Sequence, residues 1–353
     1  MNLSPDDDLR LVAETARRFG EDVLIPRMRS AEADRAVDSE TQRAFAEIGL
    51  AGLELPEEFD GAGLGCVARV LVNEELGASD TGAALALDRL GPALYPILEM
   101  GGDVSELTRG DGRVLLVTDL DGEFEISGDR ISGTAAWVPA AEADALVVLA
   151  NDQAVLVQEG WSIEPIRGAG LRAAGAGALR LADAPIATLL SDPIGASRAR
   201  ARARLYVASL MLGVLRAACD FSRDYAKERK AFGKPIAHHQ ALAFLITDMQ
   251  MALDGARLLV HEAAWRLDAG LPSESAAASA LAECVDASRL IGPSGVQILG
   301  GHGFMADYPV EKHMREARAL GLLFGGYDAA IEESGRRLCE TDSPLEIGVG
   351  EAL

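Results

Sequence analysis

The amino-acid sequence predicts an α+β fold that is mostly helical. We expect a helical domain over residues 1–112, a small antiparallel β-barrel or sandwich over residues 113–192, and a helical bundle over residues 193–353. Two observations predict these parts. Apolar residues recur at helical spacing in both flanking segments, whereas the middle segment consists of short apolar runs separated by Gly and Asp. A hydrophobic fraction of 49% in 353 residues is enough to build a sizeable core.

The amino-terminal domain begins with a helical stripe and continues past a glycine-rich loop. The stripe that predicts the first helix consists of Val12, Ala16, Phe19 and Val23. Gly61, Gly63 and Gly65 interrupt the helical pattern as a loop, and Pro92 and Pro96 mark a turn or a helix end.

The middle domain is predicted from three short apolar runs, Val114–Thr118, Ala145–Leu149 and Ala154–Val157. Hairpin turns are indicated at Ser127–Asp129 and at Asn151–Asp152. Short strands joined by tight turns favour an antiparallel barrel or sandwich over a βαβ unit.

Two long helical stripes predict the carboxy-terminal bundle. The first stripe consists of Leu205, Ala208, Leu212, Leu215 and Cys219. The second stripe, which we expect to face the core, consists of Leu242, Leu245, Met249, Ala252, Ala256 and Leu259. The first helix also has apolar residues on its other faces, which predicts burial all round, either in a bundle or in an oligomer interface.

The charge balance excludes several classes of protein. The chain carries 33 Lys and Arg residues against 55 Asp and Glu residues, a formal net charge of −22. Because polyphosphate backbones attract basic surfaces, this charge excludes a generic nucleic-acid binder.

Asp6, Asp7 and Asp8 stand where a secretory signal would carry positive charge, and no apolar run reaches the roughly 18 residues of a membrane-spanning helix. We therefore expect a cytoplasmic protein that has no membrane partner.

The cysteine pattern indicates neither a zinc site nor a disulfide framework, because the cysteines lie far apart and form no CxxC pair. We expect buried reduced thiols at Cys66, Cys219, Cys284 and Cys339.

The segment Arg229–Ile236 ends a predicted helix with two cations, Phe232 and Gly233, and His239 and Gln240 follow it. The residues alone leave two interpretations open. Cations are favourable at the carboxyl end of a helix, so the segment can be a solvated cap. It can equally be a phosphate clasp, because Arg offers a planar fork to a pyrophosphate, Phe offers a face to an aromatic ring, and Gly allows close backbone approach.

A second segment, Gln297–Phe304, contains a GGxG pattern that starts at Gly300. By itself this pattern is weak, because three glycines often only terminate a helix. It is not a dinucleotide-binding fingerprint, since a helix precedes it where that motif requires a strand.

Taken together, the two segments resemble the signatures of the acyl-CoA dehydrogenase family. The second segment matches the family pattern Q-x-x-G-G-x-G-F-x-x-D-x-x-x-x-K-x-x-x-E from Gln297 to Glu316, and the first resembles the family's adenine-dinucleotide clasp. The resemblance covers nearly the whole chain. In the amino-terminal part it includes Pro26, Leu50–Leu53, Pro56–Phe59, Gly61–Gly65 and Glu74–Gly77.

This resemblance implies a β domain between a helical domain and a four-helix bundle, with FAD lying across a subunit interface. In the family, one subunit holds the flavin ring, and its neighbour supplies the clasp for the pyrophosphate and the adenine. By motif match, the cofactor-binding residues of the clasp are Arg229, Phe232, His239, Gln240, Gln297, Gly300 and Gly301.

The family's catalytic base is missing from this chain. Family members remove the α-proton of an acyl-CoA thioester with a Glu while the β-hydrogen leaves as a hydride to the flavin. The usual Glu-Gly-Thr position falls on Phe324-Gly325-Gly326. Other members place the Glu just before an Arg that lies upstream of the clasp, and here Ala203 precedes that Arg204. We therefore assign no catalytic residue to this chain.

The flavin-side wall also departs from the family pattern. Most members carry a Thr-Glu-Pro-x-x-Gly-Ser-Asp loop after the first strand, whereas here Val117–Asp119 is soon followed by Ile126–Gly128, so the loop is predicted to be deleted. The Trp-Ile-Ser/Thr triplet, whose hydroxyl faces the flavin, reads Trp137-Val138-Pro139, and neither Val nor Pro can donate a side-chain hydrogen bond.

Losing both base positions and the flavin-side loop while the clasp stays intact favours a division of labour between two chains. The chain resembles the subunit without the base in actinobacterial α2β2 acyl-CoA dehydrogenases that oxidise steroid side-chain CoA thioesters. We therefore expect FAD as cofactor, an acyl-CoA substrate and a homologous partner that carries the Glu.

Two alternatives stay open. The chain can be a self-sufficient homotetrameric dehydrogenase with a displaced base, for which Asp328 and Glu332 are the nearest carboxylates, one turn apart on a predicted helix. It can also be a non-enzymatic scaffold that keeps the fold without flavin.

Overall fold

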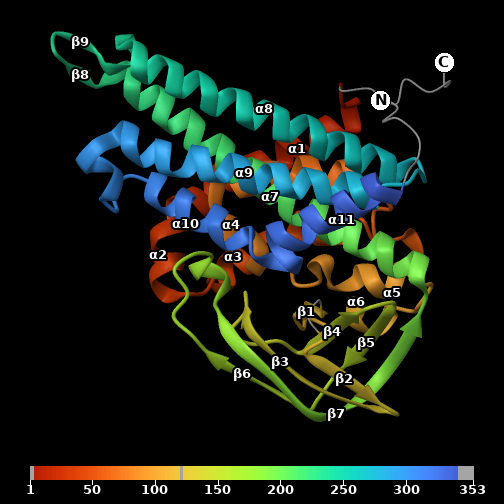
Figure 1. The fold of residues 1–353 in the computed structure, drawn as a ribbon. Helices are drawn as coiled ribbons and strands as arrows, with labels where there is room; N and C mark the ends of the chain where they lie inside the picture. Colours follow the sequence, from red (N-terminus) through yellow and green to blue (C-terminus); the bar gives the residue numbers. More distant parts are fainter. Residues whose placement is uncertain (1–3, 120–121, 341–353) are drawn as a thin grey trace.

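The protein is described by a computed structural model that covers residues 4–119 and 122–340. Two groups of helices, one seven-stranded sheet and one two-stranded sheet make up the described chain. In Figure 1 the helices form layers above a curled sheet, and residues far apart in the sequence lie side by side in these layers. The predicted fold class is confirmed.

The amino-terminal domain is helical, with short 3₁₀ turns between the helices. Its helices are α1 (Asp7–Phe19), α2 (Ile25–Asp34), α3 (Ser39–Glu47), α4 (Cys66–Leu87), α5 (Tyr95–Glu99) and α6 (Ser105–Arg109), and its 3₁₀ turns are Leu50–Gly52, Glu57–Phe59 and Gly91–Leu94. A π-helical turn, Gly20–Leu24, joins α1 to α2. The first predicted stripe is confirmed, because Ala16 and Phe19 are buried in the core.

The middle domain is a single curled sheet of seven strands. These are β1 (Val114–Asp119), β2 (Phe124–Ser127), β3 (Arg130–Val138), β4 (Ala145–Ala150), β5 (Gln153–Val157), β6 (Trp161–Pro165) and β7 (Gly177–Ser191). The strand order is β1-β4-β5-β7-β3-β2, and β6 also pairs with β7. The three predicted strands and both predicted hairpins are present.

One strand pair differs from the antiparallel prediction. β1 and β4 are parallel, with Leu116 opposite Val147, while the other pairs of this sheet are antiparallel. The β2–β3 hairpin lies between β1 and β4 in the sequence, so the chain returns to the same end of the sheet before β4 begins. Tight turns in the sequence signal antiparallel neighbours and carry no information about such a return.

The carboxy-terminal domain consists of three long helices and two shorter ones. They are α7 (Pro193–Glu228), α8 (Gln240–Asp268), α9 (Glu274–Leu299), α10 (Val310–Leu320) and α11 (Gly326–Glu340). A short hairpin of β8 (Lys230–Ala231) and β9 (Lys234–Pro235) joins α7 to α8, and 3₁₀ turns lie at Ile236–His238, Gly300–Phe304 and Leu323–Gly325. α7 runs through the middle and packs against α4, α8, α9 and α10.

The all-round apolar surface of α7 is covered by helices of the same chain. Residues from Leu205 to Leu215 are buried throughout, so of the two alternatives offered by the sequence, the bundle accounts for this surface. α7 is the one helix of the described chain that is long and apolar enough to cross a membrane, and 78% of its apolar window is buried within the fold. Such burial is typical of a core helix.

The stripe predicted to face the core on α8 is only partly correct. Met249 and Ala256 are buried, but Leu259 is 38% exposed. The residues of α8 that are buried at its centre are Met249, Leu253, Ala256 and Val260. Because apolar residues occupy several faces of α8, spacing alone could not select the face that packs.

The cysteine prediction is correct at three positions and wrong at the fourth. Cys66, Cys219 and Cys284 are buried free thiols, whereas Cys339 is exposed near the end of α11. Burial raises the pKa of the Cys219 thiol to about 12, so this thiol stays protonated at neutral pH.

A buried ion cluster joins α4 to α10. The Lys312 ammonium lies 2.9 Å from an Asp80 oxygen and 2.6 Å from a Glu316 oxygen, and all three side chains are almost fully buried. Asp80 interrupts α4 with extended backbone angles, φ −155° and ψ 102°, which brings its carboxylate to the lysine. The lysine and glutamate of the second sequence motif therefore have a structural role.

Candidate functional site

The first half of the predicted clasp lies where α7 ends. Arg229 caps α7, and its side chain is exposed and has no hydrogen-bond or ion-pair partner within the described ranges. The β8–β9 hairpin then projects from this end of the bundle (Figure 1). Phe232 and Gly233 form its turn with φ values of 52° and 81°, and the Phe232 side chain is 95% exposed.

The left-handed conformation of Phe232 is a strained one for a residue with a Cβ atom. Two positive φ values in a two-residue turn are the type I′ geometry, for which Asn-Gly is the usual sequence. The Phe-Gly pair therefore gave no hairpin signal in the sequence. A large aromatic side chain held in this conformation and left in solvent indicates a surface that binds something outside the chain.

His239 and Gln240 follow at the start of α8. The His239 ring donates from Nε2 to the Ala231 carbonyl at 3.3 Å and meets the Phe232 ring edge-on, with centroids 6.0 Å apart. Gln240 is exposed at the first position of the helix. The hairpin and the start of α8 thus form one solvent-facing surface.

The second half of the clasp lies where α9 ends. Gln297 is exposed on the last turn of α9, and Gly300 ends the helix with φ 59° and ψ −130°. A Cβ atom added at Gly300 or at Gly301 would meet no atom within 4 Å, so the backbone here is open to an approaching ligand.

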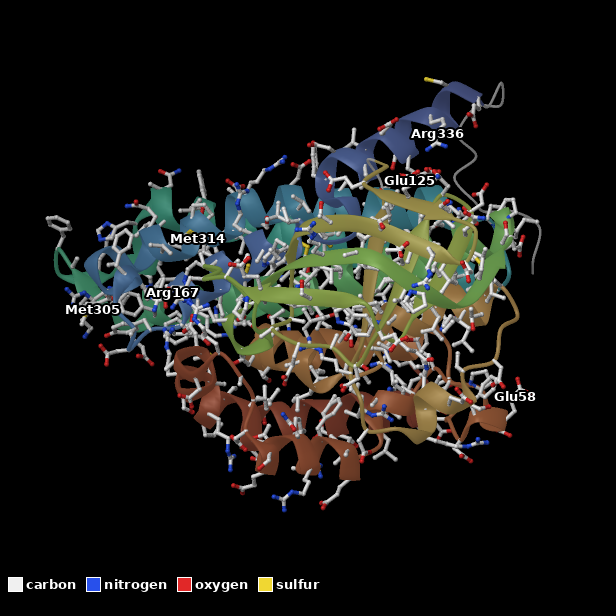
Figure 2. All side chains as sticks on the ribbon, turned by 90° about the horizontal axis from the view of Figure 1, so that it is seen from below. Glu58, Glu125, Arg167, Met305, Met314 and Arg336 are labelled. Atoms are coloured by element: carbon white, nitrogen blue, oxygen red, sulfur yellow. The ribbon has the colours of Figure 1, made fainter. Side chains whose placement is uncertain are left out.

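Three aromatic side chains that the sequence did not predict as functional join the two halves. Tyr225 lies one turn before Arg229, and its hydroxyl lies 2.8 Å from Nδ1 of His302. The His302 ring stacks on Tyr308, with centroids 5.0 Å apart and an interplanar angle of 8°. Met305, in the same loop, lies at the outer end of the molecule (Figure 2). The one available sequence signal was the position of His302 inside the GGxG motif.

The first base position lies on the wall between the sheet and the bundle. Phe324 occupies it with a left-handed backbone, φ 52° and ψ 42°, and is half-buried. Phe324 and Trp137 line a cavity of about 290 Å³ together with the ends of β1 and β3. An aromatic ring therefore stands where the family's carboxylate would stand.

A larger cavity of about 990 Å³ adjoins the first. It lies between α9, α10, the start of α11 and the loop 168–170, and it shares Trp137, Leu322 and Gly325 with the smaller cavity. None of the predicted clasp residues lines either cavity. The clasp and the cavities are therefore separate features of a single chain.

The second base position is sealed. Ala203 on α7 has no exposed surface, so no water-sized space reaches it. Its neighbours on α7 belong to a buried ion cluster: the Arg202 guanidinium lies 2.9 Å from Glu54, and the Tyr206 hydroxyl donates to Asp88 at 2.9 Å.

Arg69 completes this cluster, bridging Glu54 at 2.9 Å and Asp88 at 3.3 Å. Burial raises the pKa of Glu54, but Arg202 and Arg69 outweigh burial and hold it below its ordinary value. Glu54 therefore stays ionised and is held by arginines, which leaves it unsuited to accept a proton from a substrate.

The two alternative carboxylates are exposed. Asp328 lies at the rim of the larger cavity, and Glu332 follows one turn later on α11. A base for an α-proton needs a site shielded from water, and both of these residues are exposed to it.

The flavin-side wall has the deletion that the sequence predicted. β1 ends at Asp119 and β2 begins at Phe124, and residues 120 and 121 lie outside the described residues. The Asp119 carboxylate accepts hydrogen bonds from the backbone N–H groups of Glu123, at 2.9 Å, and Phe124, at 3.2 Å. Val138 and Pro139 are buried and offer no side-chain donor.

The residues present therefore fit one end of FAD better than the other. An unpaired Arg229, an exposed Phe232 and the open backbone at Gly300 and Gly301 suit a pyrophosphate with its adenine. On the flavin side, the smaller cavity is lined by Thr118, Thr134 and Trp137, whose side chains can each donate a hydrogen bond.

Comparisons with known proteins agree on one family. The acyl-CoA dehydrogenase amino-terminal domain model matches residues 6–104, and the carboxy-terminal domain model matches residues 196–339. The mitochondrial short-chain specific acyl-CoA dehydrogenase of Bos taurus is 31% identical, covering 90% of this chain and 86% of the relative.

Solved structures share the fold over almost the whole chain. Butyryl-CoA dehydrogenase from Megasphaera elsdenii has a TM-score of 0.85 at 23% identity, covering 96% of this chain and 100% of the other. A chain in the structure of the electron transferring flavoprotein of Acidaminococcus fermentans has a TM-score of 0.87 at 25% identity, covering 97% of this chain and 100% of the other.

Proposed function

This chain belongs to the acyl-CoA dehydrogenase family, and we propose that it is the clasp subunit of a two-chain enzyme whose homologous partner carries the catalytic carboxylate. The family assignment makes it an FAD-dependent oxidoreductase acting on acyl-CoA. When bound, FAD accepts the hydride that leaves the β-carbon of the thioester. The proposal concerns how the parts of the reaction are divided between chains.

The observation that carries the proposal is the contrast between the clasp and the two base positions. The Arg229 side chain is exposed and unpaired among the residues described, which suits a ligand shared with another chain. The base positions hold Phe324 and the fully buried Ala203. A chain that has the cofactor clasp but no catalytic base is suited to form one side of a site that a second chain completes.

In this arrangement the clasp binds and orients the cofactor for the partner. Arg229 and the open Gly300–Gly301 backbone bind the pyrophosphate, and Phe232 covers the adenine. The partner supplies the base and the wall beside the flavin. We further propose an α2β2 assembly, in keeping with the resemblance to two-chain members of the family.

The same resemblance suggests a bulky acyl group, and we propose a steroid side-chain CoA thioester as substrate. Turnover of such a thioester should exceed turnover of butyryl-CoA by the same complex, and faster oxidation of butyryl-CoA would contradict this substrate.

We also propose that the complex works in the cytoplasm, because Cys66, Cys219 and Cys284 are buried free thiols.

The FAD content of purified protein tests the division of labour. Purified alone, the chain should be nearly colourless, and the complex purified from its native host should contain about one FAD per pair of chains. The homologous protein that co-purifies should carry the missing Glu. Absorbance of released FAD against total protein measures the ratio.

The self-sufficient homotetramer is the second candidate. The two adjoining cavities beside Phe324 favour it, because together they leave space between the sheet and the bundle of the same chain. One FAD per chain in the isolated protein, with dehydrogenase activity, would support this candidate and overturn the shared site.

A further inference from the structure

His302 lies between the two halves of the clasp, and neither the motif nor the proposed shared site defines its role. Its ring is held on two sides. The Tyr225 hydroxyl meets Nδ1 at 2.8 Å, and the Tyr308 ring stacks against it at 5.0 Å. Tyr225 also packs edge-on against both rings, with centroids 5.9 Å from His302 and 6.0 Å from Tyr308.

These contacts connect the two halves of the clasp. The carbonyl of Tyr225 accepts the backbone N–H of Arg229 at 2.8 Å, so the two residues move as one helical turn. His302 follows Gly300 and Gly301 in the same 3₁₀ turn. The Tyr225–His302 hydrogen bond therefore links the helical turn that ends at Arg229 to the turn that carries the open glycine backbone.

The hydrogen bond suits a tautomer that keeps a donor on Nε2. A phenol O–H that donates to Nδ1 requires a ring with its proton on Nε2, and we assign this direction to the Tyr225–His302 pair. Nε2 has no hydrogen-bond partner in the described part of the chain. The atom is not fully buried, so solvent or a ligand can reach it. In this tautomer an N–H donor remains available in the clasp region, where the Arg229 side chain also lacks a partner among the described residues.

We propose that His302 is a further FAD-binding residue of the clasp, which donates from Nε2 to the pyrophosphate, and that Tyr225 and Tyr308 are its positioning residues. This inference rests on the proposed clasp. It adds a neutral donor to the charged fork of Arg229. A neutral donor together with a charged one suits a ligand with adjacent phosphate oxygens better than a ligand with a single anionic group.

Two replacements of His302 separate binding from structure. His302→Gln places an amide N–H near the position of Nε2 but loses the acceptor for Tyr225, whereas His302→Asn keeps an acceptor near Nδ1 and loses the Nε2 donor. If His302 binds the pyrophosphate, His302→Asn lowers the FAD affinity of the apo complex roughly tenfold, and His302→Gln lowers it less than His302→Asn. Titration of each variant with FAD, monitored through the quenching of flavin fluorescence, measures the two affinities.

A merely structural role predicts the reverse order, with His302→Asn near the parent affinity and His302→Gln weakened; this order, or no loss in either variant, overturns the inference. Arg229→Ala is the benchmark in the same titration. If Arg229→Ala also leaves FAD affinity unchanged, the clasp itself is wrong. If Arg229→Ala weakens FAD binding but the His302 variants do not, the clasp is supported and this inference fails.

Nitrogen-15 spectra of the histidine-labelled full chain give a readout that needs neither FAD nor the partner. The His302 resonances, assigned with His302→Asn, should report the neutral tautomer with the proton on Nε2, and Tyr225→Phe should change them. Thermal melting that is unchanged in Tyr225→Phe shows that the fold is intact. A His302 ring with its proton on Nδ1 would contradict the proposed donor.

Discussion

Arg229 is the arginine of the predicted clasp, and its replacement is the most direct residue-level test of cofactor binding. A charge-assisted hydrogen bond is worth about 1.5–3 kcal/mol, so Arg229→Ala should weaken FAD binding to the complex by roughly ten- to a hundredfold. Arg229→Lys should recover only part of this loss, because Lys keeps the charge but not the bidentate geometry. Equilibrium dialysis with FAD measures the affinity.

A matched control for Arg229 is available on the same helix. Arg223 is exposed on α7 and pairs with Asp220 at 2.7 Å and Asp224 at 3.3 Å, so Arg223→Ala removes an equal charge away from the clasp. FAD affinity should be unchanged in this control. Equal losses in both variants would mean that Arg229 contributes only to the general electrostatic field.

Asp328 and Glu332 are predicted to have no role as a base. Both are exposed, and the proposed base belongs to the partner, so Asp328→Asn and Glu332→Gln should leave turnover of the complex within a few-fold of the parent. Steady-state assays with an artificial electron acceptor measure this. A loss of roughly a thousandfold with FAD still bound would place the base in this chain.

At the residue scale, the sequence could predict those parts of the site that belong to contiguous motifs. Arg229, Phe232, Gly300 and Gly301 were recognisable because their spacing along the chain is itself the signal. The hydrogen bond between Tyr225 and His302 could not be recognised from the sequence, because it joins two helix ends through residues 77 positions apart.

At the scale of elements, the buried His313 and the half-buried His261 make the helices sensitive to acid. Burial, with Lys312 and Arg29 nearby, lowers the pKa of His313 on α10 to about 3. Burial also lowers the pKa of His261 on α8. Because each pKa is lower in the folded state than the ordinary 6.5, the unfolded chain binds protons more strongly, and stability falls as pH falls below 6.5.

Unfolding experiments at several pH values test this. His313 should contribute a slope of up to about 1.4 kcal/mol per pH unit between pH 6.5 and the range near 4.5 where carboxylates begin to titrate, and His261 should add to the slope in the same direction. Glu316, whose pKa is raised by burial, acts in the opposite direction, so the difference between the parent and His313→Leu is the informative quantity. Parallel curves for the two proteins would show that His313 does not titrate on unfolding.

The elements themselves differ in how well the sequence predicted them. The strands and long helices followed from their periodicity, but the β8–β9 hairpin did not, because a Phe-Gly turn is rare in type I′ geometry. The buried face of α8 was assigned partly wrongly, since apolar residues on several faces leave the packing partner to decide which face is covered.

At the scale of the whole molecule, the sequence predicted three parts but not how they meet. The kink at Asp80 and the sealing of Ala203 depend on ion clusters that join segments distant in sequence, such as Asp80 with Lys312 and Arg202 with Glu54. Pairs of this kind leave no periodic pattern. The absence of a base at Ala203 was visible in the sequence, whereas the loss of access to that position was not.

The separation of clasp and cavities within one chain predicts that the working protein is an oligomer. No predicted clasp residue lines either cavity, so under the proposed shared site we expect a cofactor held by the clasp to be covered by a second chain. Because FAD bound across two chains stabilises their association, adding FAD should raise the fraction of complex at micromolar protein, and Arg229→Ala should remove this effect. Light scattering with and without FAD measures the mass. A well-folded monomer under all these conditions, with the partner present, would contradict the shared site.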